Sequence, residues 1–277
     1  MDGTMAPKSS TSPELPPEII RHVLRFFSHD REALRACALV SQEWLFESRP
    51  FLFRYIDILC WGPYDHFVSD VLHSDNLRPW LTSIHHLSLG FLKSGMEAFM
   101  VEISEHLSNL HTMKWTNFTP QTASFHADLF PALGQFAFLH QLKLAFCMFP
   151  SFGDLKNVVV ALPYLSSLTI DQVDWNDSIG DSMPSSLTSP QLRPRLSKLA
   201  ITPAPHQRAR SDALFHWLST TPTRSTLRDL WLDLNNMASA LRMIGRSPLR
   251  ELTVRLEGIR RFLGETHAQC LRYFGNI

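Results

Sequence analysis

Residues 13 to 50 have apolar side chains spaced for three short helices. Pro16 and Pro17 fit the entry to a first helix that runs to about Phe27, because a missing N–H costs little in the first turn. At about 100° per residue its apolar side chains span roughly 160° of the circumference, whereas a one-sided surface helix needs only about 100°. These side chains are Ile19, Ile20, Val23, Leu24, Phe26 and Phe27. The apolar stripe is wider than one small core requires.

Two more helices are expected after the first. Asp30 is a candidate N-cap for a second helix through Val40, whose interior is almost wholly apolar, so that we expect it to be buried on nearly every side. Ser41 is a candidate N-cap for a third helix, which carries Trp44 and should end before Pro50. A unit of about 40 residues rarely buries so much apolar surface alone. Since the segment offers neither disulfides nor metal ligands, the pattern predicts a protein partner.

After Pro50 an L-x-x-L-x-L pattern recurs in seven copies at a fairly regular period. Alternation within each copy predicts a short strand with leucines facing inward and polar residues such as Lys143 facing outward. A further strand is expected at Tyr55 to Ile58. Such a period indicates stacked strand-and-return units, each burying its leucines against the next. The copies are Ile84-Leu87-Leu89, Leu110-Met113-Trp115, Leu139-Leu142-Leu144, Leu165-Leu168-Ile170, Leu196-Leu199-Ile201, Leu227-Leu230-Leu232 and Leu249-Leu252-Val254.

The segments between the copies predict helical returns, a loop and an end to the stack. Helix-like apolar spacing occurs at 65–72, 96–107, 212–218, 237–244 and 259–274. The last of these, with Leu263, Leu271 and Phe274, is expected to be a terminal helix that caps the stack. Residues 174–195 are rich in Ser, Pro and Asp, and we expect an inserted loop there, either functional or disordered. Residues 1–12 are expected to be a disordered tail.

The N-terminal helices carry a recognisable set of residues at fixed spacings. Leu15-Pro16 opens the module, Glu18-Ile19 and Val23-Leu24 follow, and the segments LPPEII and CALVSQEW occur together. This pattern, over residues 13 to 50, resembles the F-box, particularly that of the F-box-like proteins of mushroom-forming fungi. The resemblance implies binding to a Skp-type adaptor and, through it, to a cullin in a ubiquitin ligase. At or beneath that interface the family's pattern would place Leu15, Pro16, Ile19, Leu24, Val40 and Trp44. The alternative is a helical cap on the following domain.

The repeated pattern of residues 51–277 resembles the leucine-rich repeat, with low fidelity. That family favours Asn or Cys three residues past the last Leu of the motif, where Cys147 and Asn235 stand in two copies. We therefore expect less regular turns than in well-formed repeat proteins, because the other copies have Leu92, Phe118, Val173, Ala204 and Glu257. The fold expected is α + α/β: a three-helix F-box module at 13–50 and an irregular leucine-rich-repeat solenoid of about seven to eight strand-helix repeats at 51–277.

Outward residues of the strands form a candidate target-binding surface if the strands line the concave face of such a solenoid. Three are basic, Lys114, Lys143 and Lys198, and beyond them come Asp229, Trp231, Asp233 and Glu251. Trp231 suits a binding hot spot, because a large aromatic side chain would be held out of the core on a rigid strand. A return loop or the final helix could instead cover it. A slip of one residue in register would reverse every side chain.

Composition and charge narrow the classes of partner and compartment. Lys plus Arg equal Asp plus Glu at 26 each, so no net field draws the chain to nucleic acid or to an anionic membrane. The four cysteines form neither a C-x-x-C pair nor a compact disulfide framework, which favours a reducing compartment. Without a secretion signal or an eighteen-residue apolar run, we expect a cytoplasmic or nuclear protein.

Catalytic and cofactor motifs are missing from the sequence. It has no G-x-S-x-G, G-x-x-x-x-G-K-[ST], G-x-G-x-x-G or H-E-x-x-H, and its thirteen histidines are scattered. We therefore expect no enzyme, no cofactor and no metal site. The leading hypothesis is a substrate-recognition adaptor of a Skp-cullin-F-box ubiquitin ligase with an unknown target protein. The alternatives are a leucine-rich-repeat interaction scaffold without a ligase role and, more remotely, a hydrolase whose site no motif reveals.

Overall fold

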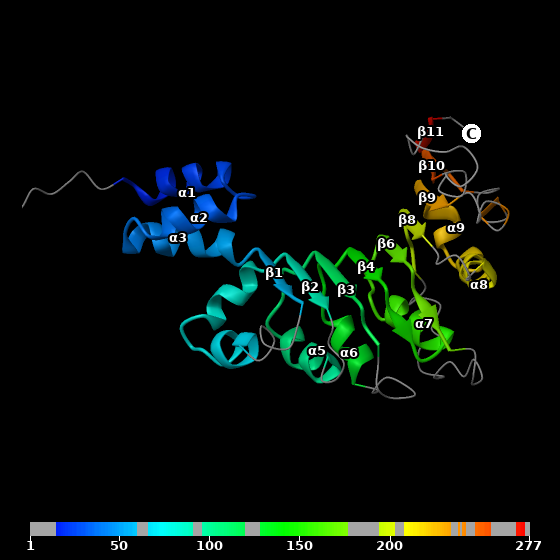
Figure 1. Cartoon of the computed structure of the whole chain (residues 1–277), viewed down its shortest axis with the longest axis horizontal. Coiled ribbons are helices and arrows are strands. Elements are labelled where there is room, and N and C mark those ends of the chain that lie inside the picture. Colours follow the sequence, from blue (N-terminus) through cyan, green and yellow to red (C-terminus); the bar gives the residue numbers. More distant parts are fainter. Residues whose placement is uncertain are drawn as a thin grey trace, which may run out of the picture. The chain divides into compact units, whose positions relative to one another are not determined.

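The protein divides into two compact units, Met1–Arg54 and Tyr55–Ile277. The computed structural model describes residues 15–59, 66–90, 96–119, 128–176, 194–202, 208–233, 238, 240–241, 247–255 and 270–274. The expected tail at 1–12 lies outside these residues. A helix, α3 (Gln42–Leu52), spans the boundary that the sequence suggested at residue 50. Figure 1 draws both units without fixing their relative placement.

The first unit consists of α1 (Pro17–Phe26), α2 (Arg31–Ala38) and α3. Both predicted caps are confirmed: the Asp30 carboxylate accepts the Ala33 N–H at 3.0 Å, and the Ser41 hydroxyl accepts that of Trp44 at 3.3 Å. The prediction that the third helix ends before Pro50 is wrong. Pro50 lies in the last turn, where its missing N–H removes only one intrahelical hydrogen bond, and α3 continues to Leu52.

The core of the first unit is small. Its wholly buried apolar residues are Ile20, Leu24 and Leu34, against which Cys37, Trp44, Phe51 and Leu52 pack. The prediction that the second helix is buried on nearly every side is wrong for this chain, since Leu34 is the only buried residue of α2. Two neighbouring helices cannot surround a third. The apolar residues that follow α2 are accordingly exposed.

The second unit contains a nine-stranded sheet whose strand order follows the order of the chain. The first eight strands are parallel, so the unit is an α/β structure. All seven copies of the repeated pattern, and the expected strand at 55–58, form strands of this sheet. The strands are β1 (Tyr55–Ile58), β2 (His86–Gly90), β3 (Thr112–Thr116), β4 (Gln141–Ala145), β6 (Ser167–Asp171), β8 (Lys198–Thr202), β9 (Asp229–Asp233), β10 (Glu251–Arg255) and β11 (Cys270–Phe274).

Alternation along the strands separates a buried face from an open face. In β4 the inward residues Leu142 and Leu144 are wholly buried, whereas Lys143 between them is only half-buried. The register stacks such residues into rows, as in the pairing of Met113, Leu142 and Leu168 on successive strands. The predicted inward and outward sides of the strands are therefore confirmed, apart from Asp233, described below, and from β10, where Thr253 is buried at 8% exposure and Leu252 is only half-buried.

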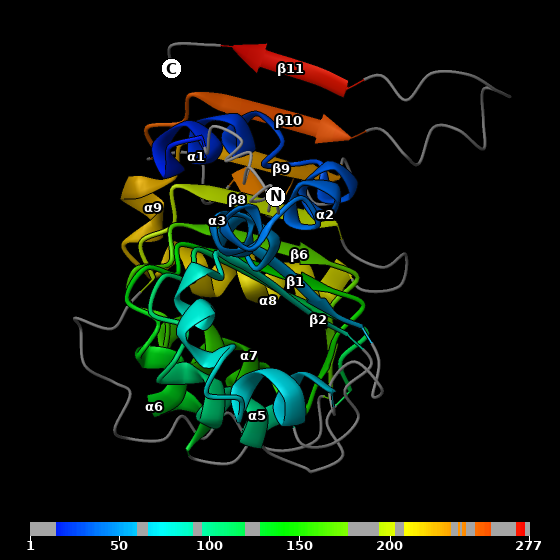
Figure 2. The ribbon, with the colours of Figure 1, turned by 90° about the vertical axis from the view of Figure 1, so that its left-hand side faces the viewer.

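Return segments cover the buried face of the sheet. They include η1 (Phe67–Leu72), η2 (Arg78–Ser83), α5 (Met96–Ser104), α6 (Leu129–Gly134), α7 (Phe152–Val160), α8 (Arg208–Ser219) and α9 (Thr223–Thr226). Helices α5 to α8 all lie on the same side of the sheet in Figures 1 and 2. Three expected returns, at 65–72, 96–107 and 212–218, coincide with η1, α5 and α8; that at 237–244 is described only at residues 238, 240 and 241, which are helical. Among the described residues, no helix has the length and apolar character to cross a membrane.

The turns that follow β3, β4 and β6 share one geometry. Asn117, Phe146 and Gln172 adopt φ values of 53°, 56° and 51°, and their N–H groups donate to backbone carbonyls of the next strand at 2.9, 2.8 and 2.7 Å. The expectation of less regular turns is wrong for the copies of β3 and β6, which have Phe118 and Val173 in the place of Asn or Cys. Backbone hydrogen bonds form the turn here, so an Asn or Cys side chain is not required for it.

A second, two-stranded sheet continues from these turns, where β5 (Met148–Phe149) pairs in parallel with β7 (Asp174–Trp175). The predicted loop at 174–195 therefore begins too early, because Asp174 and Trp175 belong to a strand. Residues 177–193 lie outside the described part of the chain. Phe118, Cys147 and Val173 are buried behind the turns, with exposed fractions of 4% or less.

The C-terminal strand β11 contradicts the predicted terminal helix at 259–274, of which residues 259–269 lie outside the described part. β11 pairs antiparallel with β10, and Tyr273 stands opposite Leu252. The few apolar positions at Leu263, Leu271 and Phe274 were a weak basis for a helix. Strand pairing also satisfies the backbone groups along the edge of β10, which a packed helix would leave unpaired.

Candidate functional site

Helix α1 has two apolar faces, and only one is buried. Ile20 and Leu24 are 1% and 0% exposed, whereas Ile19 and Phe26 are 48% and 75% exposed. At about 100° per residue Ile19 and Phe26 lie within about 20° of each other, and both lie about 100° or more from Ile20 and Leu24. His22 lies between the two exposed residues in the sequence and contacts the Phe26 ring edge-on at 5.2 Å. The helix therefore presents a separate outer apolar stripe, made by Ile19 and Phe26.

Other exposed apolar side chains of the first unit extend this surface to the other helices. Leu39 and Val40, just after α2, are 87% and 67% exposed, and Phe46 on α3 is 56% exposed. Exposed apolar groups in such numbers on a small unit are typical of a protein-binding site. The exposed apolar set, as we define it, is Leu15, Ile19, Phe26, Phe27, Leu39, Val40 and Phe46.

Four of the six predicted adaptor-binding residues are exposed: Leu15, Pro16, Ile19 and Val40. Leu24 is wholly buried and Trp44 is half-buried against the small core, so these two support the surface from beneath. Sequence reasoning left out four exposed residues, Phe26, Phe27, Leu39 and Phe46. Phe26 was already part of the over-wide stripe, whereas Leu39 was assigned to a buried helix.

An ion pair joins α1 to α3 on the side of α1 away from the outer stripe, since Arg21 lies about 140° or more from Ile19 and Phe26 around the helix. The Arg21 guanidinium donates from Nε and from an Nη atom to the two carboxylate oxygens of Glu47, at 2.8 and 2.9 Å. These hydrogen bonds, together with the charge of Glu47, raise the pKa of Arg21 above its ordinary value. Glu47 is buried to 6% exposure. The pair constrains how α1, and with it the outer stripe, is held against α3.

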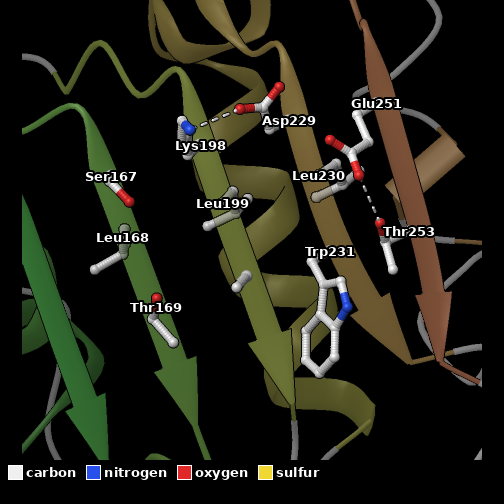
Figure 3. Close-up of a pocket in the computed structure, with 11 residues that line it drawn as sticks. Ser167, Leu168, Thr169, Lys198, Leu199, Asp229, Leu230, Trp231, Glu251 and Thr253 are labelled. Carbon is white, nitrogen blue, oxygen red and sulfur yellow. Dashed lines mark hydrogen bonds and ion pairs between the residues drawn. The ribbon is translucent and has the colours of Figure 1, made fainter. Parts of the chain in front are cut away.

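The open face of the sheet carries a row of residues in register on neighbouring strands. Lys114, Lys143, Thr169, Ala200 and Trp231 stand opposite one another in that order on β3, β4, β6, β8 and β9. Two lysines begin this lysine–tryptophan row, two small residues follow, and a large aromatic residue ends it. Part of the row, from Thr169 on β6 to Trp231 on β9, is shown in Figure 3.

The two lysines of the row are neighbours of like charge. Lys114 is exposed and Lys143 is half-buried, and the register places them side by side on adjacent strands, which are about 4.8 Å apart. Like charges directly opposite each other on adjacent strands are unfavourable. Within the described ranges neither lysine has an ion-pair partner. Both ammonium groups are therefore available to a bound anion.

Lys198 and Asp229 were expected in separate basic and acidic patches, but the structure brings them together. The Lys198 ammonium lies 3.2 Å from the Asp229 carboxylate, with side chains 64% and 35% exposed. Lys198 is not in the lysine–tryptophan row. It pairs with Ser167 and Asp229, which lie two residues before Thr169 and Trp231 on the same strands. Of the three predicted lysines, only Lys114 and Lys143 have no ion-pair partner among the described residues.

A hollow of about 280 Å³ lies on the open face, and both Trp231 and Glu251 line it. Trp231 is half-buried in it, and Glu251 lies on the neighbouring strand, with the Thr253 hydroxyl 3.5 Å from a carboxylate oxygen of Glu251 (Figure 3). Sequence reasoning missed Thr169, Ala200 and Thr253, although aligning the copies at the position of Lys143 would have revealed them. The hollow is lined by Ser167, Thr169, Lys198, Ala200, Asp229, Trp231, Glu251 and Thr253, with the backbone of the intervening leucines as its floor.

Asp233 was predicted on the exposed surface and is instead buried, with 8% of its surface exposed. It is the last residue of β9, and the register pairs it with Arg255. Asp233 is therefore not part of the accessible surface.

Histidines gather at the start of three strands, in structural roles. Nδ1 of His85, His111 and His140 lies 2.8, 2.6 and 2.9 Å from the carbonyl oxygen two residues earlier. The rings of His85 and His111 stack with centroids 4.8 Å apart, and His86 stacks on Tyr55 at 4.3 Å. Over the part of the chain that the structure describes, no three His, Cys, Asp or Glu side chains are grouped to hold a metal ion.

Comparison with known proteins does not place the chain in a family. No protein-family model matches it, and no curated protein matches it in sequence. We therefore infer function from the chemistry of two surfaces, the exposed apolar set and the open sheet face.

Proposed function

We propose that the protein is the target-binding subunit of a Skp-cullin-F-box ubiquitin ligase. In this proposal the three-helix unit binds a Skp-type adaptor, and through it a cullin, while the open face of the sheet binds a target protein. The three helices are then an F-box and the strand-and-return units are leucine-rich repeats. Such a complex would work in the cytoplasm or the nucleus.

The observation that most supports this proposal is the exposed outer stripe of α1. Ile19 and Phe26 remain exposed although the same helix already packs Ile20 and Leu24 into the core. An apolar side chain that is buried in a partner contributes roughly 1.5–3 kcal/mol relative to exposure, so covering several members of the exposed apolar set would stabilise a complex substantially. The resemblance of LPPEII and CALVSQEW to the F-box indicates which kind of partner covers it.

The chemistry of the sheet unit agrees with a binding role. Its open face offers a half-buried Trp231, a residue type that is enriched at binding hot spots, with charged side chains around it. A subunit that holds a target near a charged ubiquitin carrier raises the effective concentration of the reacting groups without catalytic residues of its own. The fold assignment is supported by parallel strands that follow one another in chain order, one for each copy of the repeated pattern.

Co-purification of the full chain with a Skp-type adaptor tests the proposal. We expect the unmodified protein to retain the adaptor and Phe26→Asp to lose it, because a charge would be placed in the centre of the apolar contact. Tyr164→Asp is the matched control, since Tyr164 is also an exposed aromatic residue, 64% exposed, but lies in the sheet unit. We expect this control to retain the adaptor.

Two outcomes would contradict the proposal. If the unmodified protein retains no Skp-type adaptor, the ligase role is wrong and a scaffold role replaces it. If Phe26→Asp and Leu15→Ala/Pro16→Ala both retain the adaptor as the unmodified protein does, the outer stripe is not the contact.

A further inference from the structure

The lysine–tryptophan row crosses the open face, and we call the surface over it the trough. Thr169 and Ala200 are the smallest residues of the row, and they lie between Lys143 on one side and Trp231 on the other. The hollow described above includes both small residues and Trp231. The trough therefore has a basic end, a shallow middle and an aromatic end.

We propose that this trough binds an extended segment of a target protein that has an acidic residue and a basic residue four positions apart, with an apolar residue midway between them. The acidic residue lies on Lys114 and Lys143, the apolar residue lies over Thr169 and Ala200, and the basic residue lies on Trp231 beside Glu251. The inference deepens the proposed function, because the segment belongs to the target that the ligase would capture.

The spacing of four follows from the geometry of the sheet. Three strand intervals separate Lys143 on β4 from Trp231 on β9, which amounts to about 14 Å at about 4.8 Å each. An extended chain rises about 3.3 Å per residue, so about four residues cover that distance. Side chains of an extended chain alternate between its two sides, so positions one, three and five face the sheet together. If the two charged residues were three positions apart, one of their side chains would face away from the sheet.

The charges of the trough determine which charge the bound segment carries at each of its ends. Lys114 and Lys143 are adjacent like charges without a carboxylate partner among the described residues, and an acidic side chain between them relieves their repulsion. At the other end the hollow has two carboxylates, those of Asp229 and Glu251. Asp229 is paired with Lys198, whereas Glu251 has no ion pair in the described part of the chain. A cationic group over the Trp231 ring is attracted by the ring and by Glu251.

Fluorescence polarisation of labelled heptapeptides against the full chain tests the inference. The first probe carries Asp, Leu and Arg at positions two, four and six, and its reversed sequence is used beside it because the direction of binding is free. The second probe has Arg at position five, and the third has Arg at both ends. We expect the first probe, in at least one direction, to bind about tenfold more tightly than the second and third, since misplaced or like charges lose the contacts.

Variants of the row sharpen the test. Trp231→Ala should weaken binding of the first probe by about 30-fold, as hot-spot truncations do, while Trp80→Ala, another half-buried tryptophan, should leave it unchanged. The double change Lys114→Glu/Lys143→Glu should transfer preference to the probe with Arg at both ends. A gain of binding of this kind cannot result from loss of folding.

The inference is overturned if the first and second probes bind equally, if neither binds, or if the double lysine change leaves the preference as it was. These outcomes are distinct from failure of the proposed function. Adaptor retention is measured on the same variants, and we expect it to be unaltered by changes in the trough. Loss of peptide selectivity with adaptor retention intact refutes only the trough, and absence of adaptor retention refutes only the ligase role.

Discussion

In the three-helix unit, Ile19 and Phe26 are exposed although they belong to a helix with a packed core face, whereas in the sheet unit Leu142 and Leu144 are wholly buried. Seven of the thirteen large apolar side chains that are exposed in the described residues lie in the first 54 residues of the chain. The sheet unit has many copies of one element, so each copy covers the next. The helical unit has only three helices, and part of its apolar surface is left exposed, which under the proposed function the adaptor covers.

The largest expected effect comes from placing a charge at a buried residue of the sheet unit, and it is compared with the same change at an exposed residue of the helical unit. Leu142→Asp would place an unpaired charge in the buried face of the sheet, which costs more than about 4 kcal/mol and should abolish cooperative thermal unfolding of the sheet unit. Ile19→Asp should change the unfolding free energy by no more than about 0.5 kcal/mol, because the side chain is already half exposed to water. Circular dichroism melting curves measure both. Equal melting of the two variants would contradict the contrast.

A smaller effect separates the two faces of α1. Leu24→Ala should destabilise the first unit by about 2–5 kcal/mol, because it leaves a cavity in a core with only two other fully buried apolar residues. Ile19→Ala should cost far less, since it opens no cavity. Hydrogen exchange of the α1 amides in the full chain measures the local unfolding free energy. Similar exchange in the two variants would show that the outer stripe is packed after all.

The smallest of the three effects depends on pH and compares two thiols. Burial raises the pKa of the Cys147 thiol from 9.0 to about 11, so the fold favours its neutral form. The associated stability is complete below pH 9 and is lost as pH rises toward 11, in total about 2–3 kcal/mol. The urea midpoint should therefore fall more between pH 8 and pH 10.5 in the unmodified protein than in Cys147→Ala. Cys37→Ala, at the half-buried thiol of the first unit, is the matched control, and an unchanged slope in Cys147→Ala would contradict the assignment.

The strands were predictable from sequence because their signal is local. In six of the seven copies two buried apolar residues flank a more exposed one, and period two assigns the faces without knowledge of the neighbours. The caps at Asp30 and Ser41 were equally local. Helix α7 was missed because Gly153, Leu155, Asn157 and Val158 to Val160 are all buried, which leaves little amphipathic period to detect.

The parts of the site that were not predictable depend on contacts between distant segments. Ile19 and Ile20 are adjacent apolar residues, and only packing against the other helices decides which one enters the core. The pairing of Lys198 with Asp229 follows from the register between β8 and β9, which a whole return segment with α8 and α9 separates in the chain. The burial of Asp233 depends on where β9 ends, and strand ends are the least certain part of a sequence-based assignment.

Neighbouring strands of the parallel sheet are also neighbours in the chain, because each strand pairs with the one made just before it. The loops between such partners close quickly compared with the long-range pairings of most sheets. At a synthesis rate of about 5–20 residues per second, the ribosome supplies one new strand about every one to six seconds. The sheet can therefore assemble from β1 onward while the chain is still being made, each strand docking on a template that is already complete.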